Sequence, residues 1–251
     1  MKIHASPFLT AEWRHLAMLS FEIDPRVLSP LVPAGTELDD WQGRTFVSLV
    51  GFMFLDTRVF GLAVPFHRNF EEVNLRFYVR RMASDGLRRG AVFVKEIVPR
   101  IAIALTARIL YGENYVALPM LHNAGPQTVS YSWLFRGREN RMELSTHGEA
   151  REVAEGSDAE FITEHYWGYA RRRGGNTTEY RVEHPRWRVC TATATQLDCD
   201  VGALYGNEFV EFLKAPPASA FLADGSKVTV FRGTSLPSRK DRSQMNNSGE
   251  T

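Results

Sequence analysis

Hydrophobic and polar side chains alternate strictly between Glu71 and Met82. Successive side chains of a β-strand point to opposite faces, so the alternation predicts a strand with one hydrophobic and one polar face. The polar face carries Glu72, Asn74, Arg76 and Tyr78. Bulk water and a polar cavity would both suit such a face, and the pattern leaves the choice between them open.

Longer hydrophobic stretches come before this strand. Residues 15–23 predict a strand that ends at Asp24 and Pro25, where Asp is a favoured N-cap and Pro a favoured first residue of a short helix. Residues 44–61 contain a run that is hydrophobic on both faces, which predicts a strand buried on both sides or curled through a barrel wall. Gly51 within this run indicates a bulge or a bend.

Turn residues divide the rest of the chain into further short elements. A strand is predicted over residues 90–99, and hairpin turns are predicted at 84–86, 137–140, 174–176 and 224–225. Helical spacing predicts helices over residues 101–112 and 200–213, although the β-branched residues of the first leave a strand open there. Ser157 with Glu160 resembles a capping box at the start of a short helix.

These elements predict an α+β fold of mainly antiparallel β-strands, whose sheet forms a cone or a barrel and carries a few short helices. One domain is expected over residues 1–236, because neither an internal repeat nor a domain-like linker interrupts the pattern. Residues 237–251 are polar and are predicted to form a disordered tail.

Composition narrows the classes of function. The chain has 251 residues and a net charge of +1, which gives no electrostatic case for a nucleic-acid or membrane partner. The longest hydrophobic run, residues 46–55, is too short to cross a bilayer, and the first residues lack a signal-peptide pattern. Cys190 and Cys199 have no zinc-site spacing, and a reducing compartment, the cytoplasm, is the simplest interpretation. A homo-oligomer is compatible with the sequence.

The sequence predicts neither a cofactor nor a metal site. It lacks a Gly-x-Gly-x-x-Gly turn after a strand, a P-loop, a nucleophile elbow and a His-Glu-x-x-His helix. A small organic ligand is therefore the expected partner, and three segments carry side chains that suit one.

Lys95 is the first candidate. Regular alternation in residues 90–99 places it on one face with Phe93 and Ile97, and places Glu96 on the other face among hydrophobic neighbours. A buried lysine has a lowered pKa and can act as a base or form a Schiff base. The alternative is a lysine near a sheet edge whose amine reaches water.

The other two segments combine histidines with polar or aromatic neighbours. His67 and Arg68 precede the polar strand face that carries Glu72, Asn74 and Arg76. His67 could act as a base, Arg68 could bind a carboxylate and Glu72 could act as an acid or base at one site. The alternative is a strand face that contacts only solvent. His165 shares a strand face with Trp167 and Tyr169, which suits either a ligand pocket or an aromatic ladder in the core.

Four long strings of the sequence carry a family resemblance. They are WRHLAMLSFEIDPRVLSPLVPAGTELD, GRTFVSLVGFMFLDTRVFG, PFHRNFEEVNLRFYVRR and EHYWGYARRRGGNTTEYRVEHPRW. Together they resemble the YqjF-like uncharacterised family of the acetoacetate decarboxylase-like superfamily, over about residues 12–235. The resemblance implies a cone-shaped, mostly antiparallel barrel with an interior pocket, and it implies that the polar face of residues 71–82 lines this pocket.

The resemblance also implies site residues. The decarboxylases carry a pocket glutamate in an aromatic-x-Glu pattern, which Phe70 and Glu72 match. Their Schiff-base lysine lies in Gly-x-Pro-Lys-Lys, whereas here Gly112 is kept and Asn114 and Tyr115 occupy the Pro and Lys positions. A phenol cannot form an imine, so the departure puts lysine-dependent decarboxylation in doubt.

Three hypotheses follow. The first is a small-molecule pocket protein that performs acid–base chemistry on a small carboxylate or carbonyl compound, with Glu72 as acid or base, Tyr115 as oxyanion donor and His67 and Arg68 at the rim. The second is a decarboxylase or aldolase that uses Lys95. The third is a non-catalytic binding or scaffold protein with a filled interior.

Overall fold

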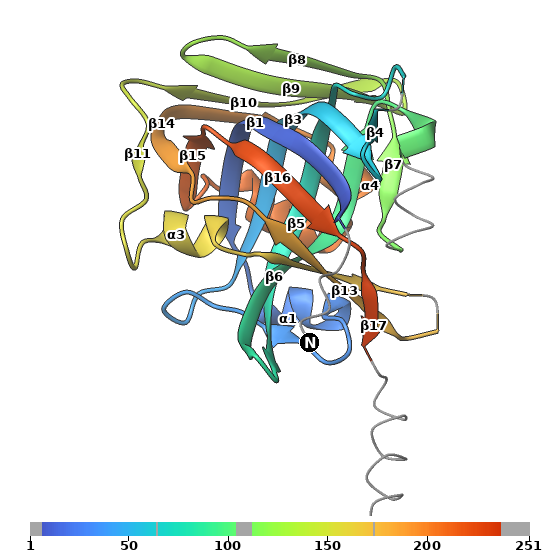
Figure 1. Cartoon of the computed structure of the whole chain (residues 1–251). Coiled ribbons are helices and arrows are strands. Elements are labelled where there is room, and N and C mark those ends of the chain that lie inside the picture. The colour runs from blue at the N-terminus through green and yellow to red at the C-terminus, as the bar shows by residue number, and fades with distance from the viewer. Residues whose placement is uncertain (1–6, 64, 104–111, 173, 237–251) are drawn as a thin grey trace, which may run out of the picture.

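The computed structural model describes residues 7–63, 65–103, 112–172 and 174–236, and more than half of these residues lie in strands (Figure 1). The strands are β1 Pro7–Glu22, β2 Glu37–Leu38, β3 Phe46–Val59, β4 Leu62–Ala63, β5 Phe70–Ala83, β6 Gly86–Val98, β7 Tyr115–Ala117, β8 Met120–Ala124, β9 Thr128–Phe135, β10 Arg138–Thr146, β11 Arg151–Glu152, β12 Trp167–Arg171, β13 Thr177–Glu183, β14 Arg188–Asp198, β15 Ser219–Ala223, β16 Ser226–Phe231 and β17 Thr234–Leu236. The short helices are α1 Pro25–Leu28, η1 Ser29–Leu31, α3 Asp158–Thr163, α4 Val201–Leu204, η2 Asn207–Phe209 and α5 Val210–Lys214.

Seven strands close into a barrel. The strands follow one another around the ring in the order β1, β3, β5, β6, β12, β13 and β16. Neighbours in this order are paired, and the pairing of β16 with β1 closes the ring. Every pairing in this ring is antiparallel except that of β6 with β12. The predicted fold of mainly antiparallel strands in a barrel is therefore confirmed.

A second layer of strands covers one outer side of the barrel. β8, β9, β10 and β14 pair in sequence, and Figure 1 shows β8, β9 and β10 stacked above β1 and β3. Tyr131 and Met142 from this layer share a hydrophobic core with Leu49 and Leu75 from the barrel wall, and α4 and α5 add to it. The hydrophobic face of β5 therefore packs between barrel and layer.

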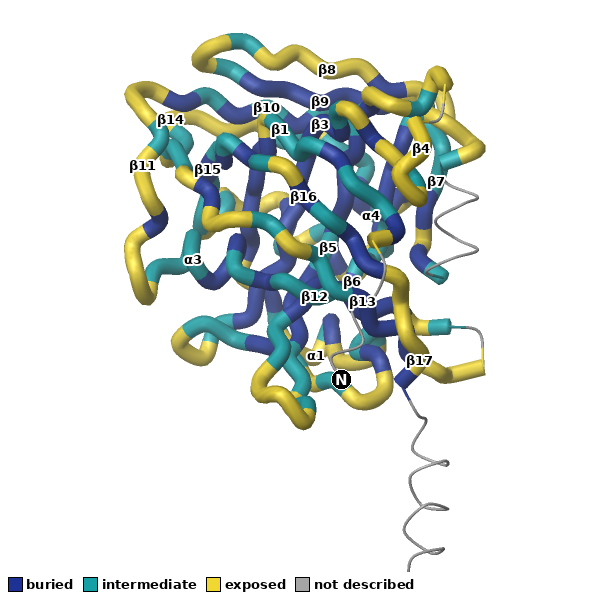
Figure 2. Tube along the Cα trace, viewed as in Figure 1, coloured by how far each residue is buried: buried dark blue, intermediate teal, exposed yellow. Residues whose placement is uncertain are grey.

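The polar face of β5 points the other way, into the barrel. Glu72 and Asn74 are 3% and 2% exposed, so this face is not solvated. Figure 2 shows that β5 is buried along most of its length. The structure thus answers the choice that the alternation left open: the polar side chains lie in the barrel interior.

Gly51 does not mark a bulge in β3, because β3 pairs with β5 without a break from Val47 to Phe54. The irregular register lies in the neighbouring strand, between Arg14 and Ala17 of β1. A Cβ atom on Gly51 would lie 2.4 Å from Cδ2 of Tyr131. The glycine therefore allows the second layer to approach the barrel wall closely.

Most local predictions are confirmed. Asp24 accepts a hydrogen bond from the backbone N–H of Arg26 at the start of α1, and Ser157 accepts one from the backbone N–H of Glu160 at the start of α3. The side chain of Glu160 accepts from the backbone of Gly156 rather than of Ser157, so the capping box is modified. Hairpins turn near residues 136–137 and 224–225 as predicted.

Two helix predictions need comment. The helix over residues 200–213 is wrong as a single element: α4 and α5 are separated by Gly206, whose φ of 121° breaks the helix. Of the helix predicted over residues 101–112, residues 101–103 are helical, and 104–111 lie outside the described residues. The tail over residues 237–251 also lies outside them.

Candidate functional site

The barrel contains a cavity of about 210 Å³. Most of its lining is hydrophobic, and the aromatic side chains are Phe8, Trp13, Phe52, Phe54, Phe70 and Phe93. Its polar lining consists mainly of Glu72, Asn74, Arg76, Glu96, Glu113, Tyr115 and Tyr180. A mostly hydrophobic cavity with a few convergent polar groups is the usual form of a small-molecule site.

Three neighbouring strands bring the carboxyl groups together. In the β5–β6 pair Asn74 lies opposite Glu96, two residues from Glu72. β6 pairs in parallel with β7, where Glu96 lies opposite Tyr115, and Glu113 comes two residues before Tyr115. Glu72, Glu96 and Glu113 therefore reach the same part of the cavity, although they are far apart in the sequence.

Hydrogen bonds link the three carboxyl groups into one cluster, which we call the carboxyl cluster (Glu72, Glu96 and Glu113). Glu72 accepts from Asn74 Nδ2 at 2.9 Å and from the Tyr115 hydroxyl at 3.2 Å. Glu113 accepts from the Tyr180 hydroxyl and from the carboxyl group of Glu96. A proton can therefore be shared across the cluster.

Burial changes the protonation of the carboxyl cluster. Loss of hydration raises the pKa of Glu72 to about 7, and the charge of Glu113 adds to the shift. Burial likewise raises the pKa of Glu113 to about 7, and it raises the pKa of Glu96 well above its ordinary value. Near neutral pH the cluster therefore contains both carboxylic acid and carboxylate, which are the two forms that general acid–base chemistry needs.

A β-bulge in β6 decides which side chains enter the cavity. Leu75 lies opposite Lys95 and Arg76 lies opposite Phe93, so Val94 is the extra residue. An extra residue shifts the alternation by one. Phe93 and Glu96 consequently both line the cavity.

Lys95 points away from the cavity on the same face as Ile97, as predicted, whereas the bulge turns Phe93 to the opposite face, so that part of the prediction is wrong. Its amine donates to the backbone oxygen of Leu204 in α4 and lies 5.9 Å from the ring centre of Tyr205. Burial lowers the pKa of Lys95. Within the described ranges, no lysine lines the cavity.

The two predicted rim residues have different environments. His67 lines the cavity, and its Nδ1 lies 2.8 Å from the backbone oxygen of Pro65. Arg68 is exposed, forms an ion pair with Asp56 and does not line the cavity. The guanidinium group that does line it belongs to Arg76, so the prediction that Arg68 sits at the pocket is not supported by its position.

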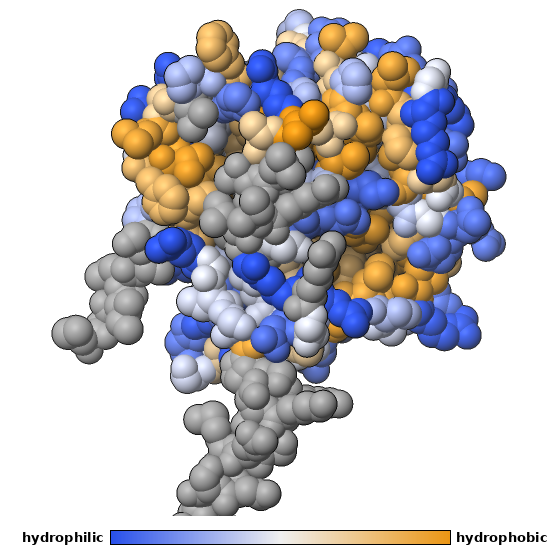
Figure 3. All heavy atoms as spheres, turned by 90° about the vertical axis from the view of Figure 1, so that its right-hand side faces the viewer, coloured by the Kyte–Doolittle hydropathy of each residue, from blue (hydrophilic) through white to orange (hydrophobic). Residues whose placement is uncertain are grey.

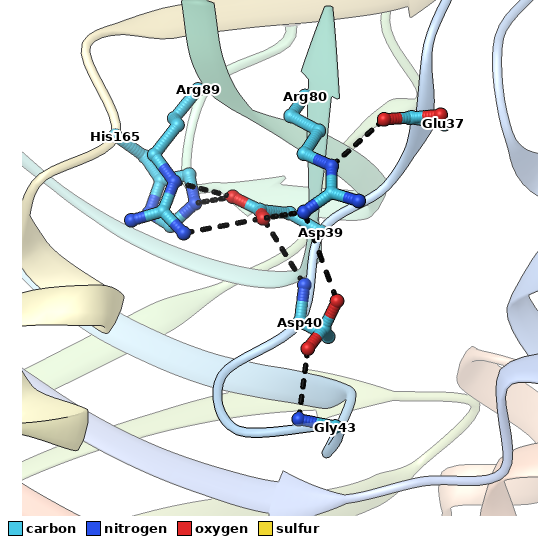
Figure 4. Close-up of polar contacts among 7 residues, drawn as sticks. All are labelled: Glu37, Asp39, Asp40, Gly43, Arg80, Arg89 and His165. Atoms are coloured by element: carbon cyan, nitrogen blue, oxygen red, sulfur yellow. Dashed lines mark hydrogen bonds and ion pairs between the residues drawn. The ribbon is translucent and has the colours of Figure 1, made fainter. Parts of the chain in front are cut away.

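His165 lies outside the cavity lining, in a buried ion network (Figure 4). Its Nε2 is 3.3 Å from Asp39, which also lies 2.8 Å from the Arg89 guanidinium. Burial lowers the pKa of His165, although the hydrogen bond to Asp39 opposes the shift. His165 precedes β12, so it does not extend the strand face of Trp167 and Tyr169 that the sequence suggested.

Exposed hydrophobic side chains lie beside the cavity. Thr57, Val59 and His67 line it, and between them the chain forms β4, where Leu62 is 72% exposed. Figure 3 shows hydrophobic residues gathered on the face that carries β4.

Sequence reasoning missed two members of the carboxyl cluster. Glu96 was visible as a charge among hydrophobic neighbours, but regular alternation separated it from Phe93, with which it lines the cavity. Glu113 lies in an irregular segment before the three-residue strand β7, where no periodic signal exists. In the part of the chain that the structure describes, no group of His, Cys, Asp and Glu side chains is arranged to hold a metal ion.

Solved structures with the same fold define the class of protein. The chain superposes on acetoacetate decarboxylase from Legionella pneumophila with a TM-score of 0.66 and 13% identity, covering 94% of this chain and 89% of that one. An acetoacetate decarboxylase-like enzyme from Sphingomonas wittichii RW1 gives 0.63 and 14%, covering 93% and 94%. The enduracididine biosynthesis enzyme MppR, solved with the condensation product of pyruvate and imidazole 4-carboxaldehyde, gives 0.64 and 10%, covering 92% and 90%. The protein therefore has the acetoacetate decarboxylase-like fold.

Sequence comparison then gives the family. Residues 10–227 match the model of DUF2071, described as an uncharacterized conserved protein, and the chain belongs to that family. It is similar to the uncharacterized protein YqjF of Bacillus subtilis strain 168, with 27% identity over 188 residues, which are 72% of this chain and 75% of that protein. The resemblance found in the sequence is thereby confirmed. Among the described residues, no helix is long and apolar enough to cross a membrane.

Proposed function

We propose that the protein binds a small, largely apolar carbonyl compound in the barrel cavity and catalyses proton transfer on it. The observation that carries this proposal is the convergence of Glu72, Glu96 and Glu113 at one end of an otherwise hydrophobic cavity. Burial raises the pKa of all three groups, so that carboxylic acid and carboxylate occur in the same place near neutral pH.

The reaction is the exchange of a proton between the carbon next to a carbonyl group and the carbonyl oxygen. Ionised Glu72 accepts the proton from carbon, and the electron pair of that C–H bond forms the carbon–carbon double bond of an enol. Protonated Glu96 gives its proton to the oxygen. Tyr115 hydrogen-bonds both carboxyl groups, so it can return the proton from Glu72 to Glu96.

A carbonyl compound suits the cavity better than a carboxylate does. The cavity lining contains the guanidinium group of Arg76 and three carboxyl groups, so acidic groups outnumber it. Arg68 forms an ion pair with Asp56 and does not line the cavity. An anionic ligand would therefore meet like charge beside buried carboxyl groups. An imine mechanism through Lys95 is disfavoured, because its amine binds Leu204 on the other side of the barrel wall.

Proton exchange in heavy water tests the proposal. We expect the wild-type protein to exchange the α-protons of some members of a panel of small ketones and aldehydes, followed by proton NMR. Glu72→Gln removes the base and should slow exchange by about 10²–10⁴-fold.

Glu71→Gln is the matched control, because Glu71 is adjacent in sequence but binds His122 outside the cavity. This variant should exchange like the wild type. Borohydride treatment during turnover should label no lysine. Equal exchange by the wild type and Glu72→Gln would overturn the proposed role of Glu72.

A further inference from the structure

The polar end of the cavity contains buried hydrogen-bond acceptors without donors. Glu96 Oε2 and Asn74 Oδ1 are both buried, and neither has a hydrogen-bond partner among the residues that the structure describes. Glu96 is 1% exposed and Asn74 is 2% exposed, and both line the cavity. Unsatisfied acceptors in a cavity are costly unless a ligand or water supplies donors.

The donors around the carboxyl cluster are already engaged. The amide nitrogen of Asn74 and the hydroxyl of Tyr115 both donate to Glu72, and the hydroxyl of Tyr180 donates to Glu113. Among the described residues, Arg76 is the one arginine or lysine that lines the cavity. Its Nε is buried and has no acceptor within the same part of the chain. The guanidinium group of Arg76 lies over the ring of Tyr78, and the distance from Arg76 Cζ to the ring centre is 5.7 Å.

We propose that the ligand of this cavity carries a positively charged nitrogen, a primary ammonium or an amidinium, which donates to Glu96 Oε2, Asn74 Oδ1 and Glu113. The proposal deepens the proposed function and rests on it, since it adds a cationic group to the compound that the cavity receives. An ammonium group has three N–H donors and no acceptor, so it matches a cluster that offers acceptors.

The apolar body of the ligand would occupy the aromatic part of the cavity. Phe52 and Phe54 lie with Trp13 along one wall, with ring centres 5.2 Å and 5.7 Å from that of Trp13. A buried cation is tolerated only when it is paired and hydrogen-bonded, and the carboxyl cluster provides both.

Binding of a cation should release protons from the carboxyl cluster. The charge favours carboxylate over carboxylic acid, so affinity should rise with pH around neutrality. The titratable and charged groups that face the bound nitrogen are Glu72 and Arg76 of β5, Glu96 of β6, Glu113 and Tyr115 at β7, Tyr180 of β13 and His67 of the loop before β5. Arg76 opposes cation binding, and the three carboxyl groups outnumber it.

Calorimetry with matched probes tests the proposal. The probes are 2-phenylethylamine and 2-phenylethanol, which differ in the charged group, and each is titrated at pH 6, 7 and 8. We expect the amine to bind more than about tenfold more tightly than the alcohol at pH 8, which is the discrimination that one charge-assisted hydrogen bond supplies. The affinity for the amine should rise by up to about tenfold per pH unit, the limit for one released proton.

Two buffers with different ionisation enthalpies measure the protons released on binding. Glu113→Gln should weaken amine binding and reduce proton release, whereas Glu71→Gln should leave both unchanged. Where Glu113→Gln fails to fold by circular dichroism, Asn74→Leu replaces it, and it should weaken amine binding because it removes an acceptor. Equal binding of amine and alcohol, affinity that falls with pH, or no binding of either probe would overturn the proposal.

The failure of this inference is distinguishable from the failure of the proposed function. Suppose that neutral ketones exchange α-protons in a Glu72-dependent way and that the amine binds no better than the alcohol. The proposal of a cationic ligand would then be wrong, and the proposed acid–base site would remain supported. Amine binding with proton release, but no exchange by any carbonyl compound, would keep the cation site and sink the catalysis.

Discussion

At the scale of single residues, burial of carboxyl groups is the property on which the site depends. Glu72, Glu96 and Glu113 come from positions where hydrocarbon side chains would pack without cost. Natural proteins accept such destabilisation at functional sites, and under the proposed function acid–base reactivity would be the compensating gain.

The stability of the protein should therefore fall as pH rises. A carboxyl group whose pKa is raised from 4.5 to about 7 by folding stays protonated in the folded state while it ionises in the unfolded state. Stability is then greatest below pH 4.5 with respect to this group, and it is lost progressively between pH 4.5 and 7. We expect one such group to lower the unfolding free energy of the wild-type protein by on the order of 2 kcal/mol between pH 5 and pH 8.

Urea unfolding of Glu113→Gln at both pH values measures this effect. The amide cannot ionise, so the variant should lose less stability than the wild type across the same interval and should be the more stable protein at pH 8. Glu71→Gln should follow the wild type. A Glu113→Gln protein with the full pH dependence would show that Glu113 titrates normally.

Single elements explain which parts of the site could be predicted from the sequence. The strict alternation of β5 predicted its strand and the shared face of Glu72, Asn74 and Arg76, and these side chains do line one cavity. That Phe93 and Glu96 share one face could not be predicted, because a bulge depends on the pairing of β6 with β5 rather than on the order of residues within β6.

The position of Glu113 was equally inaccessible. It comes to Glu96 through the parallel pairing of β6 with β7, which joins residues separated by an irregular segment. For His165 the aromatic neighbourhood suited either a ligand pocket or an aromatic ladder in the core, and the pattern did not indicate that the side chain hydrogen-bonds Asp39 outside the cavity lining. Local patterns predict elements well and predict long-range neighbours poorly.

Within β3, Gly51 should be intolerant of any side chain. A Cβ atom at 2.4 Å from Tyr131 must push the second layer away from the barrel wall. We expect Gly51→Ala to destabilise the protein by about 1–3 kcal/mol, as overpacking of a core does. The measurement is urea unfolding.

Tyr131→Ala provides the control for this clash. In the double variant the added methyl group enters the space that the ring leaves, so the two effects should not add. If the losses of unfolding free energy in the two single variants add up in the double variant, the destabilisation by Gly51→Ala arises in the backbone of β3 and not from contact with Tyr131.

At the scale of the whole molecule, the barrel wall separates two environments. Its outer side packs against β8, β9 and β10, and its inner side holds the carboxyl cluster. Acid–base catalysis requires groups held in fixed positions, and the strands of the barrel wall provide such positions for the cluster under the proposed function.

Ligand binding should accordingly stabilise the entire fold. A carbonyl compound that undergoes α-proton exchange, present at 100 times its dissociation constant, should add about 2.7 kcal/mol to the unfolding free energy. For a chain of this size, each 1 kcal/mol corresponds to about 2–4 °C in Tm, which differential scanning fluorimetry resolves. Compounds that exchange but leave Tm unchanged would indicate that the reaction occurs outside the folded cavity.

The extra residue in β6 has a consequence for comparing relatives. A homologue with a regular strand needs one residue fewer between the aromatic side chain at the position of Phe93 and the acid at the position of Glu96. An ungapped alignment would then set Lys95 of this chain opposite that acid, and would suggest an amine where the chamber holds a carboxyl group. A one-residue gap at Val94 restores the correspondence.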